Sequence, residues 1–331
     1  MRRVEDERLM TGGSAFTADL VRPGALHMAL VRSSHAHANI RRIDVGRARA
    51  APGVAHVLTG EAVAHINMPA PPADTPVGPP QHPLSTGRVR YVGEAVAAIL
   101  ATSARSARDA LDLVEIDYEP LPVCANLDLA RAGAPQLHES APGNIAFTIS
   151  RGDPNVEQAL AAAPVKVHVV ADNPRINGSP IETSAVIASY DQFTGEVTVE
   201  GTIQSPLRGR ADIALALGIP ENRLRLIVRD IGGGFGSKSS IYPEHVLAAY
   251  LAMTLHTAVC WESSRSESLA NMVHGRAMDV ELTLGLDRDG RMLALDGHIR
   301  ADMGGYLWFG GSRSPHTAAL MLPGPYAIPS A

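Results

Sequence analysis

The chain has 331 residues, a hydrophobic content of 45% and a formal net charge of −5 at pH 7. This length predicts two or three domains with proper apolar cores, and the mildly acidic balance gives no reason to expect nucleic acid as a partner. Only two cysteines occur, Cys124 and Cys260, and they lie far apart in the sequence. We therefore expect no disulfide framework, zinc site or iron–sulfur cluster in this chain.

The N-terminus and the apolar runs predict a cytoplasmic protein without a membrane segment. Arg2 and Arg3 are followed by Glu5 and Asp6, where a secretory signal would place its apolar core. The longest apolar stretch, residues 246–255, is too short to span a bilayer.

Residues 1–125 alternate short apolar runs with one helical pattern, and they form the first predicted domain. Residues 103–113 are expected to be a helix, because Ala107, Ala110 and Leu111 fall on one face at helical spacing. Residues 68–83 contain seven prolines among small polar residues and are expected to be a surface loop. A linker over residues 126–163 then leads to a second domain over residues 164–331.

The second domain is expected to combine strand pairs with helices. Alternating and helical spacings predict strands over 183–190, 196–203 and 222–231, helices over 207–217 and 243–255, and a hairpin of 278–286 with 292–300. The turn signals are Thr194-Gly195 for the first pair and residues 287–290 (Asp-Arg-Asp-Gly) for the hairpin.

The most informative segment is the glycine-rich run between the strand over 222–231 and the helix over 243–255. It reads Gly-Gly-Gly-Phe-Gly-Ser-Lys over residues 232–238. Glycine permits positive φ and lets a ligand touch the backbone, and amides before a helix favour anions. This pattern predicts a site for an anionic cofactor.

Three other interpretations compete for this loop. A Walker A loop and a dinucleotide fingerprint both need glycine at the sixth place, where this chain has Ser237. A third interpretation is a tight turn between packed elements with no ligand at all. The loop alone does not decide between a turn and a cofactor site, so the rest of the chain has to.

Short motifs along the whole chain resemble the molybdenum-binding large subunit of the xanthine dehydrogenase, aldehyde oxidase and carbon monoxide dehydrogenase family. The motifs of the N-terminal half are Arg3-Val4-Glu5-Asp6, Val31-Arg32-Ser33, His35-Ala36-His37-Ala38, Pro52-Gly53-Val54, Arg90-Tyr91-Val92-Gly93-Glu94 and residues 114–122. Those of the second half are Ile181-Glu182, Gln204-Ser205-Pro206, residues 232–238, Trp261-Glu262, His274-Gly275-Arg276 and residues 302–306. Each motif is weak alone, and their order and spacing together carry the resemblance.

The resemblance implies an α+β fold. An N-terminal α/β hammerhead-like domain would be followed by the first part of a mixed α/β molybdopterin-binding domain. It also implies that Gln204, Gly233, Gly234, Phe235 and Gly236 bind a molybdenum–molybdopterin cofactor, for which the cytosine dinucleotide is one of the forms in the family. No side chain of this chain would bind the metal directly, because the pterin holds it. The family loop usually has glycine where this chain has Ser237.

The activity that the resemblance implies is hydroxylation of an aldehyde, an N-heterocycle or a similar small molecule, with water as the oxygen source. Electrons would leave through the pterin to iron–sulfur clusters and FAD on partner subunits. Family large subunits are more than twice as long, and the catalytic glutamate and an active-site loop of relatives have no counterpart here. We therefore expect no catalytic residue in this chain and a partner chain that carries the complementing C-terminal half.

Two alternatives stay open: a non-catalytic remnant or interaction module of the same fold, and an unrelated phosphate- or nucleotide-binding protein. Glu182 is expected to be capped or paired rather than to act in chemistry. From Asp302 onward, apolar residues such as Met303, Leu320 and Tyr326 stand among glycines and prolines. This segment is expected to have little regular structure and to be a docking surface.

Overall fold

The computed structural model describes residues 3–69, 80–133, 135–308, 311 and 313–331. Two compact units divide the chain, and each is described by itself. Of the described residues, the first unit draws on those within 3–69, 80–122 and 178–273, and the second on those within 123–177 and 274–331. Each unit therefore joins segments that are far apart in the sequence.

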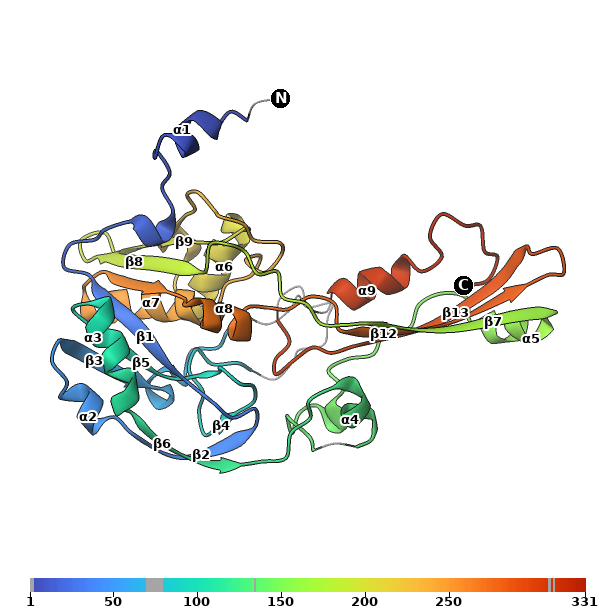
Figure 1. The fold of residues 1–331 in the computed structure, drawn as a ribbon, viewed down its shortest axis with the longest axis horizontal. Coiled ribbons are helices and arrows are strands. Elements are labelled where there is room, and N and C mark those ends of the chain that lie inside the picture. The colour runs from blue at the N-terminus through green and yellow to red at the C-terminus, as the bar shows by residue number, and fades with distance from the viewer. Residues whose placement is uncertain (1–2, 70–79, 134, 309–310, 312) are drawn as a thin grey trace. The chain divides into compact units, whose positions relative to one another are not determined.

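The first unit is built on a mixed sheet of seven strands among the described residues (Figure 1). In spatial order the strands are β10 (Leu224–Ile227), β9 (Glu196–Gly201), β8 (Ala185–Asp191), β11 (Val259–Glu262), β1 (Leu26–Arg32), β5 (Ala95–Ala101) and β3 (Val54–Thr59). The pairs β1–β11 and β9–β10 are parallel, and the other neighbours are antiparallel. The pairing of β1 with β11 joins the N-terminal segment to the segment that carries the glycine loop.

Helices and a smaller sheet complete this unit. The smaller sheet has the order β4 (Arg88–Val89), β2 (Ala38–Asp44) and β6 (Glu115–Pro120). The helices are α1 (Asp6–Met10), α2 (Gly46–Arg49), α3 (Ala104–Asp109), α6 (Pro206–Leu217), α7 (Pro243–Leu255) and α8 (Arg265–Asn271).

The core of the first unit lies around α7 and the middle of the large sheet. Val246, Leu247 and Leu251 of α7 are fully buried in one cluster with Val186 and Val199 from the sheet. All seven residues of β5 are buried, which fits a strand covered on both faces. Because α7 starts five residues after the glycine loop, its burial fixes the end of that loop.

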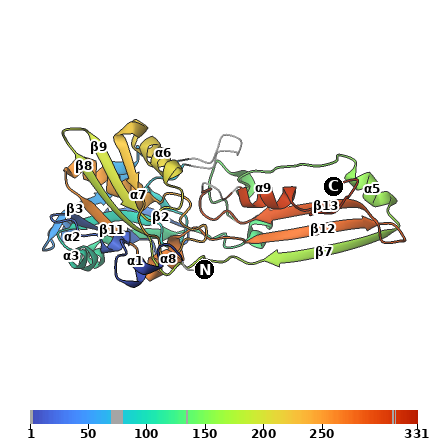
Figure 2. The same cartoon turned by 90° about the horizontal axis from the view of Figure 1, so that it is seen from above.

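The second unit contains a three-stranded antiparallel sheet in the order β13 (Met292–Ala301), β12 (Met278–Leu286) and β7 (Val165–Asn173), seen side by side in Figure 2. Helix α5 (Val156–Ala162) packs where β12 has a glycine, since a Cβ on Gly285 would lie 3.1 Å from the Leu160 side chain. The other helices of this unit are α4 (Leu127–Arg131) and α9 (Arg313–Leu320).

The predicted strand pairs and helices of the second half are confirmed, with small differences in several bounds and the largest difference in one strand. The strand expected over 222–231 covers only Leu224–Ile227, because its parallel pairing with β9 ends at Ile227. Beyond that point Asp230 turns toward the N-terminal segment, where its carboxylate accepts from Arg8 and from the Ala15 amide.

Three other expectations have different outcomes. The helix expected over 103–113 is capped by Ser103 and ends at Asp109, followed by a 3₁₀ turn over Leu111–Leu113. Most of the proline-rich loop, residues 70–79, lies outside the described residues. After Asp302 the described residues form one helix, α9, with Pro315 in its first turn, a place that proline tolerates, and they leave Leu320, Met321 and Tyr326 exposed. The docking role of this segment stays a prediction.

The domain boundaries at residues 125 and 163 stay predictions. Within the described part of the chain, no helix is both long and apolar enough to cross a membrane.

Candidate functional site

The glycine loop between β10 and α7 has an unusual backbone. Gly233, Phe235 and Gly236 have φ angles of 99°, 53° and 88°. A left-handed conformation is uncommon for an aromatic residue, and the Phe235 side chain is also 76% exposed. Backbone strain of this kind persists where the surrounding structure enforces it, and it is a reason to look for function.

Gln204, which follows β9, approaches the loop so closely that a side chain at position 234 would have to displace it. A Cβ on Gly234 would lie 2.5 Å from the side-chain Cδ of Gln204, a distance that forces one of them to move. The side-chain oxygen of Gln204 accepts from the amides of Gly236 at 3.2 Å and Lys238 at 3.1 Å. The backbone amide of Gln204 donates to the Lys238 carbonyl at 2.8 Å.

These bonds fix which way the Gln204 amide group faces. Its oxygen is held by two loop amides, so its NH₂ group points to the other side. Among the described residues this nitrogen has no hydrogen-bond partner, and Gln204 is exposed. The side-chain oxygen of Gln204 therefore stabilises the loop, and its side-chain nitrogen remains available as a hydrogen-bond donor.

Three successive backbone amides of the loop also lack a hydrogen-bond acceptor among the described residues. The amides of Gly232, Gly236, Ser237, Lys238 and Ser239 all have acceptors within the chain. Those of residues 233, 234 and 235 have none among the described residues. Buried or half-buried amides are normally paired, and successive unpaired amides form anion-binding concavities.

Ser237, the residue that departs from the usual family loop, does not obstruct this surface. Its side chain is buried, and its hydroxyl donates to the Gly234 carbonyl at 2.6 Å. The Tyr242 hydroxyl donates to the Ser237 carbonyl and accepts from the Val273 amide at 3.0 Å. Ser237 thus points inward and tightens the loop.

Lys238 also points inward, which the sequence did not reveal. Its side chain is fully buried, and its ammonium group lies 2.7 Å from Oε2 of Glu182. Burial lowers the pKa of Lys238, and the hydrogen bond and charge of Glu182 offset part of that shift. A lysine after a glycine loop is usually taken as a phosphate ligand, but this one is committed to a carboxylate beneath the loop.

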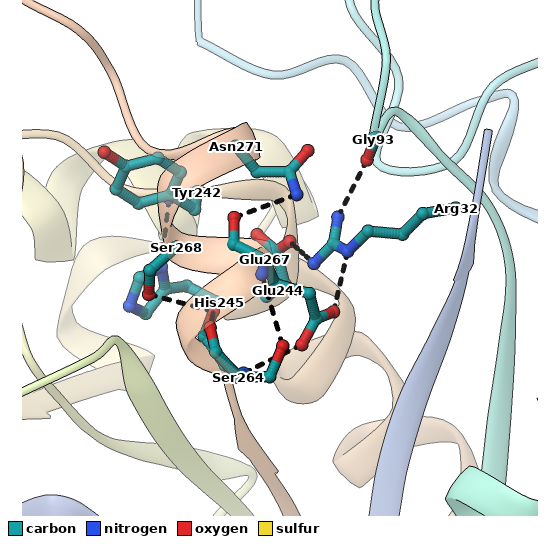
Figure 3. Close-up of polar contacts among 10 residues, drawn as sticks. Arg32, Gly93, Tyr242, Glu244, His245, Ser264, Glu267, Ser268 and Asn271 are labelled. Atoms are coloured by element: carbon teal, nitrogen blue, oxygen red, sulfur yellow. Dashed lines mark hydrogen bonds and ion pairs between the residues drawn. The ribbon is translucent and has the colours of Figure 1, made fainter. Parts of the chain in front are cut away.

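A second polar network holds the helices that follow the loop (Figure 3). The guanidinium of Arg32, at the end of β1, binds Glu244 of α7 and Glu267 of α8 at 2.7 Å each and the Gly93 carbonyl at 3.2 Å. Burial alone would lower the pKa of Arg32, and the two carboxylates raise it above its usual range. Glu267 also accepts from the Ser264 amide in a capping box.

The structure thus brings together all five residues expected to bind a cofactor: Gln204, Gly233, Gly234, Phe235 and Gly236. Glu182 is paired, as expected. Sequence reasoning missed the inward direction of Lys238 and the Arg32 network, because both depend on pairings between residues more than 50 positions apart.

Comparisons with known families match both parts of the chain. The model of the "aldehyde oxidase and xanthine dehydrogenase, a/b hammerhead domain" matches residues 11–122. The model of the "molybdopterin cofactor-binding domain" matches residues 137–331.

Individual relatives agree with the family models. The chain is 34% identical to a carbon monoxide dehydrogenase large chain from Afipia carboxidovorans over 92% of this chain and 39% of the relative. It is 34% identical to the gamma subunit of a 6-hydroxypseudooxynicotine dehydrogenase complex from Paenarthrobacter nicotinovorans over 99% of this chain and 42% of the relative.

Among solved structures, quinoline 2-oxidoreductase from Pseudomonas putida 86 is similar, with a TM-score of 0.91 and 32% identity. That match covers 99% of this chain and 42% of the solved chain. The chain therefore spans about two fifths of the length of each of these three proteins.

Proposed function

Because the chain belongs to the molybdenum hydroxylase large subunits of the xanthine dehydrogenase, aldehyde oxidase and carbon monoxide dehydrogenase family, we propose that its glycine loop and Gln204 form one wall of a molybdopterin site. The observation that carries this proposal is the set of donors without partners in the described chain. It consists of the amides of residues 233–235 and the side-chain nitrogen of Gln204.

The residues present fit an anionic, oxygen-rich group. Gly234 has no side chain to hold such a group away from the backbone, and its amide is one of the three that lack an acceptor. The inward hydroxyl of Ser237 keeps the same surface clear. When bound, the cofactor supplies two-electron oxidation chemistry, whereas the residues of this chain bind it, orient it and brace the loop.

The reaction we propose is the oxidative hydroxylation of an electron-poor carbon in an aldehyde, an N-heterocycle or a similar small molecule, with water as the oxygen source. Electrons would pass to iron–sulfur and FAD subunits. The relatives described as a large chain or as a complex subunit support such an assembly.

We expect the 331-residue chain alone to show no turnover of aldehydes or N-heterocycles with an artificial electron acceptor. In this proposal, the acid–base group and the substrate-side loop belong to the part of the relatives that this sequence does not span. Loss of one acid–base group alone slows comparable reactions by about 10²–10⁴-fold. The assay compares the chain with and without a polypeptide that supplies the remaining length of a relative.

Turnover that appears only with the complementing polypeptide supports the proposal. Robust oxidation by the chain alone contradicts it. Full cofactor loading without turnover in the completed protein would favour a non-catalytic remnant of the fold.

A further inference from the structure

We propose that Glu182 and Lys238 are a positioning pair that holds both ends of the glycine loop from beneath, so that the amides of residues 233–235 stay available to a ligand. The inference rests on the proposed function, because it explains how this chain keeps the cofactor-binding surface in place. Neither residue contacts the ligand in this account.

One carboxylate oxygen makes both contacts. Oε2 of Glu182 accepts from the Gly232 amide at 2.8 Å and from the Lys238 ammonium group at 2.7 Å. Gly232 opens the loop and Lys238 closes it. The Glu182 amide also donates to the Gly232 carbonyl at 3.1 Å, so main chain and side chain hold the same end.

The packing around this pair is tight. A Cβ on Gly232 would lie 2.6 Å from the Cβ of Glu182, so the two backbones are already in close contact. The Lys238 side chain has no exposed surface, and that of Glu182 is 12% exposed. A buried ammonium group without its carboxylate would be strongly unfavourable, so the charge of Lys238 ties the loop end to Glu182.

The other carboxylate oxygen of Glu182 allows the charge to be removed without breaking a further hydrogen bond. Oε1 is buried and has no hydrogen-bond partner among the described residues. Glu182→Gln therefore preserves the shape and one acceptor for the Gly232 amide, and it removes the charge that Lys238 requires. Lys238→Met keeps the buried stem and leaves the carboxylate unpaired.

The test is amide hydrogen exchange of residues 232–241, measured by mass spectrometry on the full chain. Exchange in this segment should be about tenfold faster or more in Glu182→Gln and in Lys238→Met, because each leaves one buried charge without its partner. The double variant should recover part of the protection. A purely additive double variant would contradict a coupled pair.

The matched control is Glu200→Gln. Glu200 is also buried and accepts from Arg22 and Arg229, but it makes no contact with the glycine loop among the described interactions. Glu200→Gln should lower the global stability without a selective change in the amide exchange of residues 232–241. If amide exchange in residues 232–241 is accelerated equally in the control and the test variants, the pair is only a general stabilising contact. That result would overturn the inference.

Molybdenum content separates this inference from the proposed function. It is measured by elemental analysis on wild type and on the same variants, each purified with the remaining length of a relative supplied. Wild type that binds molybdenum, together with single variants that keep normal exchange and full metal, refutes the positioning pair and leaves the proposed function intact. Selective loop exchange in the variants with no molybdenum in any preparation supports the pair and contradicts the proposed function.

Discussion

Replacing Arg32 with methionine is expected to lower the free energy of unfolding by about 3–5 kcal/mol, because it removes the shared partner of two carboxylates. The side chains of Arg32 and Glu244 are only 12% and 5% exposed, and that of Glu267 is 24% exposed. Such a loss is a large fraction of the stability of a typical domain, which is about 5–15 kcal/mol. Urea denaturation at neutral pH followed by circular dichroism measures it.

Arg47→Met is the matched control for this change. Arg47 also pairs with a glutamate, Glu115, at 3.1 Å, but both side chains are 68% exposed. An exposed pair contributes about 0–1 kcal/mol, so this variant should be nearly as stable as wild type. An equal decrease in the free energy of unfolding in the two variants would show that the Arg32 network stabilises the protein no more than an exposed ion pair does.

His245→Gln is expected to remove a large part of the acid sensitivity of the protein. His245 is fully buried in the first turn of α7, and burial lowers its pKa from 6.5 to about 4. The folded state therefore prefers neutral histidine, and the unfolded state binds the extra proton between pH 6.5 and about 4. Stability from this residue is present above pH 6.5 and falls by about 2 kcal/mol between pH 7 and pH 5.

Glutamine suits this position because it preserves the local hydrogen bond. Nδ1 of His245 accepts from the Tyr242 amide at 2.9 Å, and a glutamine oxygen serves the same role in a capping box. Urea denaturation at pH 7 and pH 5 should show a smaller loss in His245→Gln than in wild type or in His65→Gln, which changes an exposed histidine. Identical losses in all three proteins would contradict burial of a neutral His245.

The sequence predicts the elements better than it predicts their pairings. Spacing alone placed helix α7 and the β12–β13 hairpin, because their apolar positions and turn residues are local signals. The parallel pairing of β1 with β11 joins residues more than 200 positions apart, and no local pattern reports it. The same holds for Arg32, whose two carboxylates come from distant helices.

The candidate site was predictable in its backbone and not in its supporting side chains. The glycine run and the family resemblance together pointed to Gln204 and the loop, and the structure places them in contact. Lys238 could not be assigned from sequence, because a lysine at the end of a glycine loop faces a phosphate in one fold and a buried carboxylate in another. The direction is decided by Glu182, which lies 56 residues away.

In the proposed site, the loop of residues 232–236 binds a molybdopterin cofactor through its backbone. The decisive measurement is the molybdenum and pterin content of the protein purified from a host that makes the cofactor, with the remaining length of a relative supplied. Gly234→Ala puts a Cβ 2.5 Å from Gln204, whereas the control Gly46→Ala meets only the flexible carboxylate of Asp44 at 3.2 Å.

We expect about one molybdenum and one pterin per chain in wild type and in Gly46→Ala. In Gly234→Ala we expect the molybdenum and pterin content to fall by about tenfold or more. Wild-type protein without molybdenum or pterin under these conditions, or full loading in Gly234→Ala, would contradict the account.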